Sequence, residues 1–435
     1  MESTGCVHSD VVPSDVIVVG AGVIGLGIAW EAARTGRRVT VVDPAPGSGA
    51  SYAAAGMLAA VSEYHYQEED LLGLMLRSAE LWPSFAEAAG PDWGYLGTPT
   101  LCLAADAADR TAFADLRAAQ EAHGLAVRPL TVRESRADEP LLAPGIAGAF
   151  RIEADHQVDP RRLVAALLAR LVERSGEGAV VRARAASLLW EGPDGGGRVA
   201  GGAVPDGAVP DGAGPDGAGR VAGVVLDDGR ELRAEETIVA NGLGARELGG
   251  LPVVLPLRPV YGDILRLRVP ERLRPLVTAT VRGLVRGRPV YIVPREDGTV
   301  VIGATQREDG SDAVSAGGVY ELLRDAQALV PAVAELELYE TTARARPGTP
   351  DNAPLLGRVR THDGEGPGAA GTVPGLIIAT GFFRHGVLLT PVAAEVCAGL
   401  LAGRADPRWD AFLPDRFAPR LAGTPAAQAA ATGGN

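Results

Sequence analysis

The chain has 435 residues, 46% of them hydrophobic, which is enough for two domains with sizeable cores. Its 41 basic and 54 acidic residues give a net charge of −13, which argues against nucleic acid or an anionic membrane surface as the main partner. All of the basic residues are arginine, so chemistry that needs a lysine, such as a pyridoxal-phosphate Schiff base or a Walker A loop, is excluded.

Cysteine and histidine usage gives no sign of a disulfide framework or a metal centre. Cys6, Cys102 and Cys397 lie far apart in the chain, and the six histidines lack the spacing of metal ligands. The first fifteen residues lack the basic and apolar regions typical of an export signal, and no run of about 18 apolar residues occurs, so we expect no export. We therefore expect a cytoplasmic protein that has neither a metal site nor a membrane span.

The first predicted element is a buried strand at residues 16–19 that runs into a glycine-rich turn. In this Gly-x-Gly-x-x-Gly pattern, Gly20 permits the tight turn and Gly22 lets the backbone approach a pyrophosphate. The third glycine, Gly25, lets the following helix pack closely on the strand. The turn thus has the form of a dinucleotide-binding fingerprint.

The helix after this turn begins at Val23 and Ile24, and its N-terminus offers unpaired N–H groups and a positive dipole end to phosphate. The second strand, residues 39–42, ends at Asp43, which lies 43 − 20 = 23 residues after the first glycine. This is close to the spacing expected for a carboxylate on a ribose hydroxyl. These features predict a dinucleotide site, with an ordinary strand-turn-helix unit as the alternative, and leave open whether the ligand is NAD or FAD.

The middle of the chain alternates helices and strands. Residues 71–88 and 109–123 are typical of amphipathic helices, and residues 100–103 of a strand, which together indicate a separate substrate module. Asp159 as N-cap and Pro160 as first residue mark the start of a further helix.

A low-complexity segment at residues 192–219 repeats Val-Pro-Asp-Gly-Ala, and we expect it to be a mobile insertion. An antiparallel sheet is predicted from short β-rich runs at residues 262–269, 289–293 and 299–302. A helix is expected at 315–329. A final strand and glycine turn at 375–381 are followed by a helix at about 391–401. This order of strand, glycine turn and helix is the same as at the N-terminus.

Three blocks of residues carry a resemblance to a known family. The first is the fingerprint with Asp43 and the segment 50–58, and the second is 290–305. The third is made of Arg346-Pro-Gly-Thr-Pro-Asp and of the string 380–390. In this order the blocks resemble those of the D-amino-acid oxidase family of flavoproteins, most closely its glycine oxidase branch, over residues 16 to about 400.

The resemblance implies a non-covalent FAD, because no cysteine lies near Arg344, where related enzymes attach flavin covalently. Backbone N–H groups of the turn that ends at Thr390 are expected at the pyrimidine edge of the flavin, where they stabilise negative charge. The expected FAD-binding residues are Gly20, Gly22, Val23, Ile24, Gly25, Asp43, Ser51, Ala55, Gly56, Met57, Gly242, Gly381, His385, Gly386, Val387, Leu388, Leu389 and Thr390.

Three residues are expected to act on the substrate. The rigid fork of Arg346 suits a carboxylate held by two parallel bonds, and the family places an arginine there for the amino acid carboxylate. Tyr291 matches a family position that donates to the same carboxylate, and Arg384 a family arginine near the substrate. Phe382 replaces a histidine that is common in closer glycine oxidases.

The implied fold is α/β, with a Rossmann-type FAD-binding domain and an antiparallel-sheet substrate domain of the glutathione-reductase and D-amino-acid oxidase type. The FAD-binding domain is expected to be discontinuous, at residues 15–62, 150–250 and 345–420. The substrate domain is expected at residues 63–149 and 251–344. Residues 1–14 and 421–435 are expected to be a disordered leader and tail.

The activity implied is oxidative deamination of glycine to glyoxylate, ammonia and hydrogen peroxide, with oxygen as co-substrate, in thiamine biosynthesis. The alternatives are an oxidase or dehydrogenase of another amine, such as a D-amino acid or sarcosine, and a non-catalytic FAD-binding subunit. An NAD-dependent enzyme is a third alternative, less favoured than the other two. A homo-oligomer is possible.

Overall fold

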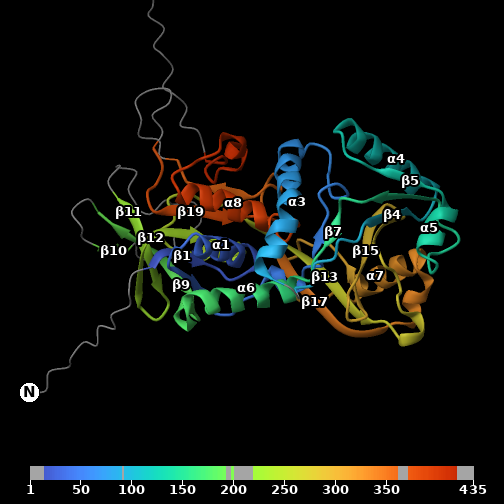
Figure 1. Ribbon diagram of the computed structural model, residues 1–435, viewed down its shortest axis with the longest axis horizontal. Coiled ribbons are helices and arrows are strands. Elements are labelled where there is room, and N and C mark those ends of the chain that lie inside the picture. The colour runs from blue at the N-terminus through green and yellow to red at the C-terminus, as the bar shows by residue number, and fades with distance from the viewer. Residues whose placement is uncertain (1–13, 91–92, 193–196, 200–218, 361–370, 419–435) are drawn as a thin grey trace, which may run out of the picture.

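The computed structural model describes residues 14–90, 93–192, 197–199, 219–360 and 371–418. The expected tail, the expected leader up to residue 13 and most of the expected low-complexity insertion lie outside these ranges. Within that expected insertion, Gly197–Val199 are described and form the strand β10, which pairs with β9. Ser14, which the prediction assigned to the leader, is the first residue of a strand. Figure 1 shows the described elements arranged around two sheets at the two ends of the molecule.

The first sheet has a parallel centre in the order β8-β2-β1-β12-β19. These strands are β1 Ser14–Val19, β2 Val39–Val42, β8 Val180–Val181, β12 Glu231–Val239 and β19 Leu376–Thr380. Antiparallel strands extend it, namely β9 Ala185–Glu191, β10 Gly197–Val199, β11 Arg220–Leu226 and β18 Leu355–Gly357. The Rossmann-type sheet predicted from the two ends of the chain is confirmed, since β1 and β19 both pair with β12.

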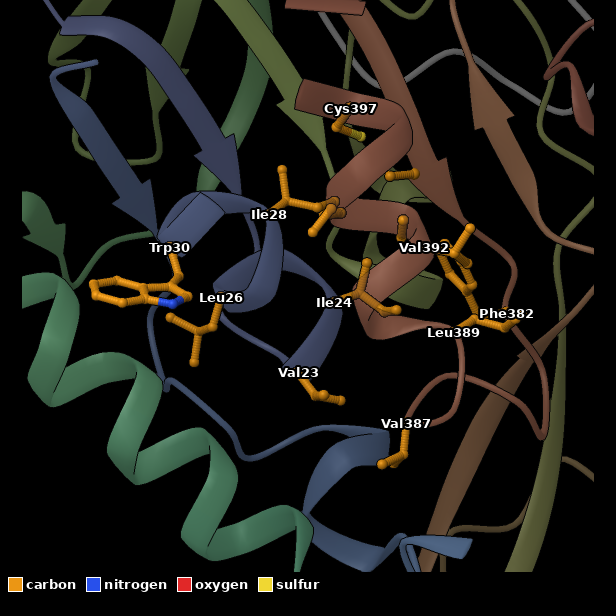
Figure 2. Packing of buried hydrophobic residues seen from close by; sticks show 14 of the residues in the cluster. Val23, Ile24, Leu26, Ile28, Trp30, Phe382, Val387, Leu389, Val392 and Cys397 are labelled. Carbon is orange, nitrogen blue, oxygen red and sulfur yellow. The ribbon is translucent and has the colours of Figure 1, made fainter. Parts of the chain in front are cut away.

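Helices cover the parallel strands and form one core with them. They are α1 Val23–Arg34, α3 Glu69–Ala89, α6 Pro160–Ser175 and α8 Thr390–Leu401, and short α2 Ala50–Ala53 follows β2. Figure 2 shows Leu26 and Trp30 of α1 on the side of α6, and Ile24 and Ile28 on the side of α8. Burial of both sides of α1 explains why it is apolar almost all round.

Helix α3 belongs to this core, although the sequence placed it in the substrate module. Leu74, Met75 and Trp82 are fully buried in the same cluster as α1 and α8. The Ser78 hydroxyl and the Trp82 indole both donate to the carbonyl of Leu388, at 2.6 and 2.8 Å. Amphipathic spacing identifies a buried face but not the sheet against which that face packs.

The second sheet has the order β17-β13-β16-β15-β14-β4-β6-β5 and is antiparallel except for the β14–β4 pair. Its strands are β4 Thr100–Ala104, β5 Arg128–Leu130, β6 Gly148–Ile152, β13 Arg258–Arg268, β14 Thr280–Val285, β15 Arg288–Pro294, β16 Thr299–Gly303 and β17 Glu337–Gly348. The associated helices are α4 Ala107–Ala122, α5 Val132–Asp138 and α7 Ala316–Leu329. A two-stranded ribbon is formed by β3 Met57–Leu58 and β7 His156–Gln157.

Two predicted domain boundaries, 149/150 and 344/345, fall inside β6 and β17 of this second sheet. Pairing with β4 and β13 carries these strands past the predicted limits. The N-cap predicted at Asp159 agrees with the structure, and Ser315, expected as the first residue of the helix 315–329, is the N-cap of α7. The Asp159 carboxylate accepts from Arg161 and Arg162 N–H, and the Ser315 hydroxyl accepts from Gly318 N–H.

An ion pair holds the two layers together beside the cavity. Arg161 of α6 donates to both carboxylate oxygens of Glu340 in β17, at 3.0 and 2.5 Å, and its guanidinium lies 3.6 Å above the ring of Tyr52 in α2. Hydrogen bonding to Arg161 lowers the pKa of Glu340 to about 2. The pair stays charged at neutral pH and joins a helix of the first layer to the edge strand of the second.

Close packing at the fingerprint makes Gly25 intolerant of a side chain. A Cβ at Gly25 would collide with the carbonyl oxygen of Gly20, whereas one at Gly73 in α3 would meet no atom within 4 Å. We expect Gly25→Ala to destabilise the protein by about 1–3 kcal/mol. The control Gly73→Ala should stabilise it by about 0.5–1 kcal/mol, because alanine favours a helix. Urea unfolding measures both, and equal midpoints would contradict the assignment.

The ends of β9 and β11 predict that most of the low-complexity insertion can be removed. Glu191 pairs directly with Arg220, so deleting residues 193–218 leaves Gly192 and Gly219 as a two-residue hairpin loop. We expect the thermal midpoint to change by less than about 4 °C, because the deletion removes no described element other than the edge strand β10. A large loss of stability in calorimetry would contradict this expectation.

Candidate active site

A cavity of about 900 Å³ is lined by residues from both sheets. Most of the residues predicted for the site line it, namely Gly20, Gly22, Val23, Ile24, Asp43, Ser51, Ala55, Gly56, Met57, Gly242, Tyr291, Arg346, Gly381, Arg384, Gly386 and Val387. The other predicted residues, Gly25, His385, Leu388, Leu389 and Thr390, are not among its lining. The cavity therefore brings together segments more than 300 positions apart in the chain.

The fingerprint forms one end of the cavity. Gly20 has a φ of +107°, and a Cβ there would lie 2.6 Å from the carbonyl oxygen of Ala240, so only glycine fits the turn. Asp43 accepts from the N–H groups of Ala21 and Ala45, at 2.7 and 2.8 Å, which holds its carboxylate at the cavity wall.

One predicted donor at this end is already engaged. The N–H of Val23 donates to the Ser51 hydroxyl at 3.0 Å, so it is not the unpaired group that the sequence predicted. The hydroxyl itself lines the cavity and remains able to donate to a ligand. The Ser51 hydroxyl thus accepts from the helix N-terminus and can itself donate a hydrogen bond into the cavity.

The turn before α8 forms the opposite wall, and it corrects one prediction. Leu389 N–H donates to the carbonyl of His385 at 2.8 Å, so it is not available to a flavin. The N–H groups of Gly386 and Val387 have no hydrogen-bond partner among the described residues, and both residues line the cavity. The turn uses its later N–H groups for its own closure and leaves the earlier ones as donors.

Arg346 is a cavity arginine whose charge is not neutralised within the described part of the chain. Its guanidinium lies over Gly262, where a Cβ would collide with it, and its one hydrogen bond is to the carbonyl of Thr305 at 3.5 Å. No carboxylate of a described residue forms an ion pair with it. Such a group binds an anion readily, because a carboxylate supplies the missing counter-charge.

Tyr291 lies close enough to Arg346 for the positive charge of the guanidinium to act on the pKa of its phenol. Burial raises the pKa of the Tyr291 phenol to about 12, against the opposing effect of the Arg346 guanidinium. The phenol is therefore protonated at neutral pH and acts as a hydrogen-bond donor. Together the two side chains present donors and positive charge to the same part of the cavity.

Arg384 differs from Arg346 because its charge is already paired. It donates to a carboxylate oxygen of Glu68 at 2.7 Å, and both residues are largely buried. Its guanidinium also lies 5.4 Å from the ring of Phe383. Arg384 lines the cavity as predicted, but as half of an ion pair.

Sequence reasoning missed a buried charge network behind Tyr291. Glu63 and Arg282 form an ion pair at 2.5 Å, and His385 Nδ1 lies 3.3 Å from the second Glu63 oxygen. Burial alone would raise the pKa of Glu63, but the Arg282 guanidinium holds it well below its usual range. Burial lowers the pKa of His385, so its ring is neutral. These residues come from three distant segments, and no local pattern marks them.

The described residues contain no group of three or more His, Cys, Asp or Glu side chains arranged to hold a metal ion. Among the helices of the described ranges, none has the length and apolar character needed to cross a membrane.

The family model DAO, described as FAD dependent oxidoreductase, matches residues 15–400. The chain belongs to this family. It is 33% identical to the glycine oxidase of Geobacillus kaustophilus over 396 residues, which cover 89% of this chain and 92% of that protein. It is 30% identical to a putative thiamine biosynthesis oxidoreductase ThiO of Rhizobium etli, over 90% of this chain and 98% of that protein.

Solved structures agree with this membership. The crystal structure of the Geobacillus kaustophilus glycine oxidase superposes with a TM-score of 0.74 and 30% identity, and covers 93% of this chain and 99% of that one. The chain also matches bifunctional ThiO/ThiG proteins, of which it spans about half the length. The predicted flavoprotein family, its Rossmann-type fold and its FAD cofactor are thereby confirmed.

The cavity fits this cofactor. Gly20, Gly22 and Gly56 line it without side chains, and a Cβ at Gly56 would collide with the carbonyl oxygen of Val158. Asn241 also lines it, and its side-chain oxygen is buried without a partner among the described residues. An unpaired buried acceptor of this kind calls for a hydrogen-bond donor from a bound molecule. The individual contacts of FAD remain predictions.

Loss of Glu63 should leave Arg282 as an unpaired buried charge. We expect Glu63→Gln to cost about 3–5 kcal/mol in urea unfolding at pH 7. The control Glu335→Gln breaks an exposed ion pair with Arg272 and should cost at most about 1 kcal/mol. Because folding depresses the pKa of Glu63, the pair stabilises the protein above the usual carboxyl pKa and less in acid. The difference from wild type should therefore shrink below about pH 4, and a difference independent of pH would contradict the assignment.

Proposed function

We propose that this protein catalyses the FAD-dependent oxidative deamination of glycine. The overall reaction is glycine + O₂ + H₂O → glyoxylate + NH₃ + H₂O₂. The observation that carries the proposal is the uncompensated guanidinium of Arg346 beside the protonated phenol of Tyr291, in the cavity that begins at the fingerprint. The names of the Geobacillus and Rhizobium relatives support both the reaction and a place in thiamine biosynthesis.

Arg346 and Tyr291 bind and orient the amino acid. The planar guanidinium holds the substrate carboxylate through two parallel hydrogen bonds, and the phenol donates to the same group. Gly262 keeps the space above its strand open for the guanidinium. Two such anchors fix the position of Cα, which favours reaction by placing it in one orientation.

When bound, FAD supplies the two-electron acceptor for oxidation of the substrate C–N bond. The N–H groups of Gly386 and Val387, which have no partner in the described ranges, and the N-terminus of α8 make the adjoining wall favourable for negative charge. The cavity-lining carboxylates are engaged, Asp43 by backbone N–H groups and Glu63 by Arg282. The proposed reaction therefore depends on placement and on the charge of the cavity walls, with the amine entering in its neutral form.

A cytoplasmic location is part of the proposal. Cys102 and Cys397, the cysteines within the described ranges, are free and buried, which suits a reducing compartment. The substrate partners proposed are a small amino acid and oxygen.

Arg346→Lys tests the carboxylate assignment. The purified protein should be yellow, and glycine should bleach its flavin absorbance in the absence of oxygen. Lysine keeps the charge but loses the bidentate geometry, so we expect the KM for glycine to rise by about 10- to 100-fold at equal FAD content. Peroxide release at varied glycine measures it.

The matched control is Arg268→Lys, an exposed arginine of β13 in the same sheet. It should leave KM within twofold of the wild-type value. A wild-type protein that glycine does not reduce would refute the proposed function, and an unchanged KM in Arg346→Lys would refute the role of Arg346.

A further inference from the structure

His385 has a buried ring whose hydrogen-bonding capacity is unused. It lies in the turn before α8, directly before Gly386 and Val387, which line the cavity. Its side chain is 1% exposed, and neither ring nitrogen has a hydrogen-bond partner among the described residues. Nδ1 nevertheless lies 3.3 Å from Oε2 of Glu63, a residue of the cavity wall. The ring therefore has an acceptor within reach and a nitrogen that can bind one more proton.

The charges around His385 cancel within the described part of the chain. Two carboxylates come from the segment 59–68, one guanidinium from β14 and one from the turn itself, namely Glu63, Glu68, Arg282 and Arg384. They form two ion pairs, at 2.5 and 2.7 Å. His65 of the same segment is uncharged at neutral pH, because burial lowers its pKa to about 4. A neutral His385 thus lies in surroundings without net charge.

Reduction of a bound flavin would disturb this balance. A hydride carries two electrons and one proton, so its transfer adds one negative charge, which we expect beside the N–H groups of Gly386 and Val387. Burial lowers the pKa of His385, and the Glu63 carboxylate opposes that effect. A further negative charge acts in the same direction as Glu63, because a nearby anion favours the protonated ring. Protonation of His385 would restore the neutrality of the cluster.

We propose that His385 binds a proton when the flavin is reduced and releases it when oxygen reoxidises the flavin. Glu63 favours a hydrogen on Nδ1 of the neutral ring, so the added proton binds Nε2. In the charged ring Nδ1–H donates to Glu63. His385 is therefore a positioning residue that holds a proton beside the turn. The inference rests on the proposed function only for the origin of that proton.

Protons and electrons balance over the cycle. In the first half, Cα of the neutral amine gives a hydride to the flavin, and the amine nitrogen gives up a proton as the C=N bond forms. That proton is the one bound by His385. In the second half, oxygen takes the hydride from the reduced flavin and the proton from His385, and the product is hydrogen peroxide. Both the flavin and His385 return to their first state.

The test counts the protons that the FAD-loaded protein binds for each two electrons. A spectroelectrochemical titration between about pH 5 and pH 10 gives this count from the slope of the midpoint potential against pH, and it needs no substrate. The hydride accounts for one proton. We expect a count of two near pH 7. It should fall to one at higher pH, where His385 stays neutral, and at lower pH, where His385 is already charged.

His385→Asn removes the titrating group but keeps a side-chain N–H that can donate to Glu63. We expect this variant to bind one proton for each two electrons at every pH. The matched control is His156→Asn. His156 of β7 also has its pKa lowered by burial, but its Nδ1 is bonded to the Tyr95 hydroxyl at 2.7 Å and it does not line the cavity. The control should keep the count of two.

The outcomes separate this inference from the proposed function. A count of one in the wild-type protein at every pH would overturn the role of His385, and this result needs no variant to fold. A count of two that persists in His385→Asn would place the second proton on the flavin and overturn it as well. Failure of glycine to reduce the flavin would refute the glycine proposal alone, because the titration uses an electrode as the reductant.

Discussion

The backbone contact between Gly25 and Gly20 is the constraint on which the rest of the structure depends. It lets α1 start directly at the end of β1, in a place where a Cβ on either residue would collide with backbone. With α1 seated there, α6 and α8 pack on its two sides, and the turn before α8 comes to the carboxyl ends of the parallel strands. Helix α3 then fixes that turn by donating twice to the carbonyl of Leu388.

Charge compensation decides which cavity residue is open to an anion. The chain has arginine at every Lys-or-Arg position, and four arginines line the cavity, namely Arg282, Arg344, Arg346 and Arg384. Arg282 is paired with Glu63 and Arg384 with Glu68. Arg344 is exposed and donates to the carbonyls of Ser48 and Ala343. Arg346 is partly buried, and among the described residues its guanidinium is bonded only to the carbonyl of Thr305. An amino acid carboxylate would therefore find its counter-charge at Arg346, and the paired arginines shape the walls without competing for it.

One face of the second sheet carries Tyr291 of the proposed carboxylate site and the residues paired with it on the neighbouring strands. Side chains alternate between the two faces of a strand, so in-register neighbours such as Tyr291, Arg282 and Cys102 lie on one face. The opposite face packs on α7 through a separate apolar cluster. A single register thus sets both the reach of the cavity and the order of the groups along it.

Local pattern was sufficient for the elements and for much of the cavity lining. The fingerprint, the Asp159 cap, the helix after Ser315 and the strand before Gly381 depend on residues close in sequence, and family motifs named Arg346 and Tyr291. The ion-pair partners could not be predicted from the sequence, because no residue close to Glu63 in the chain indicates its pairing with Arg282. The same holds for Arg384 and Glu68. For the same reason the sequence misassigned the core that α3 joins.

The sequence by itself determined the dinucleotide turn, the type of each main element and the family, because these follow from short-range sterics and from motif order. Only the tertiary structure decided which N–H groups and which cavity arginines have no partner or ion pair among the described residues, and how far the cavity extends. Those properties arise from contacts between segments up to about three hundred residues apart, where hydrogen bonds and ion pairs compete for the same groups.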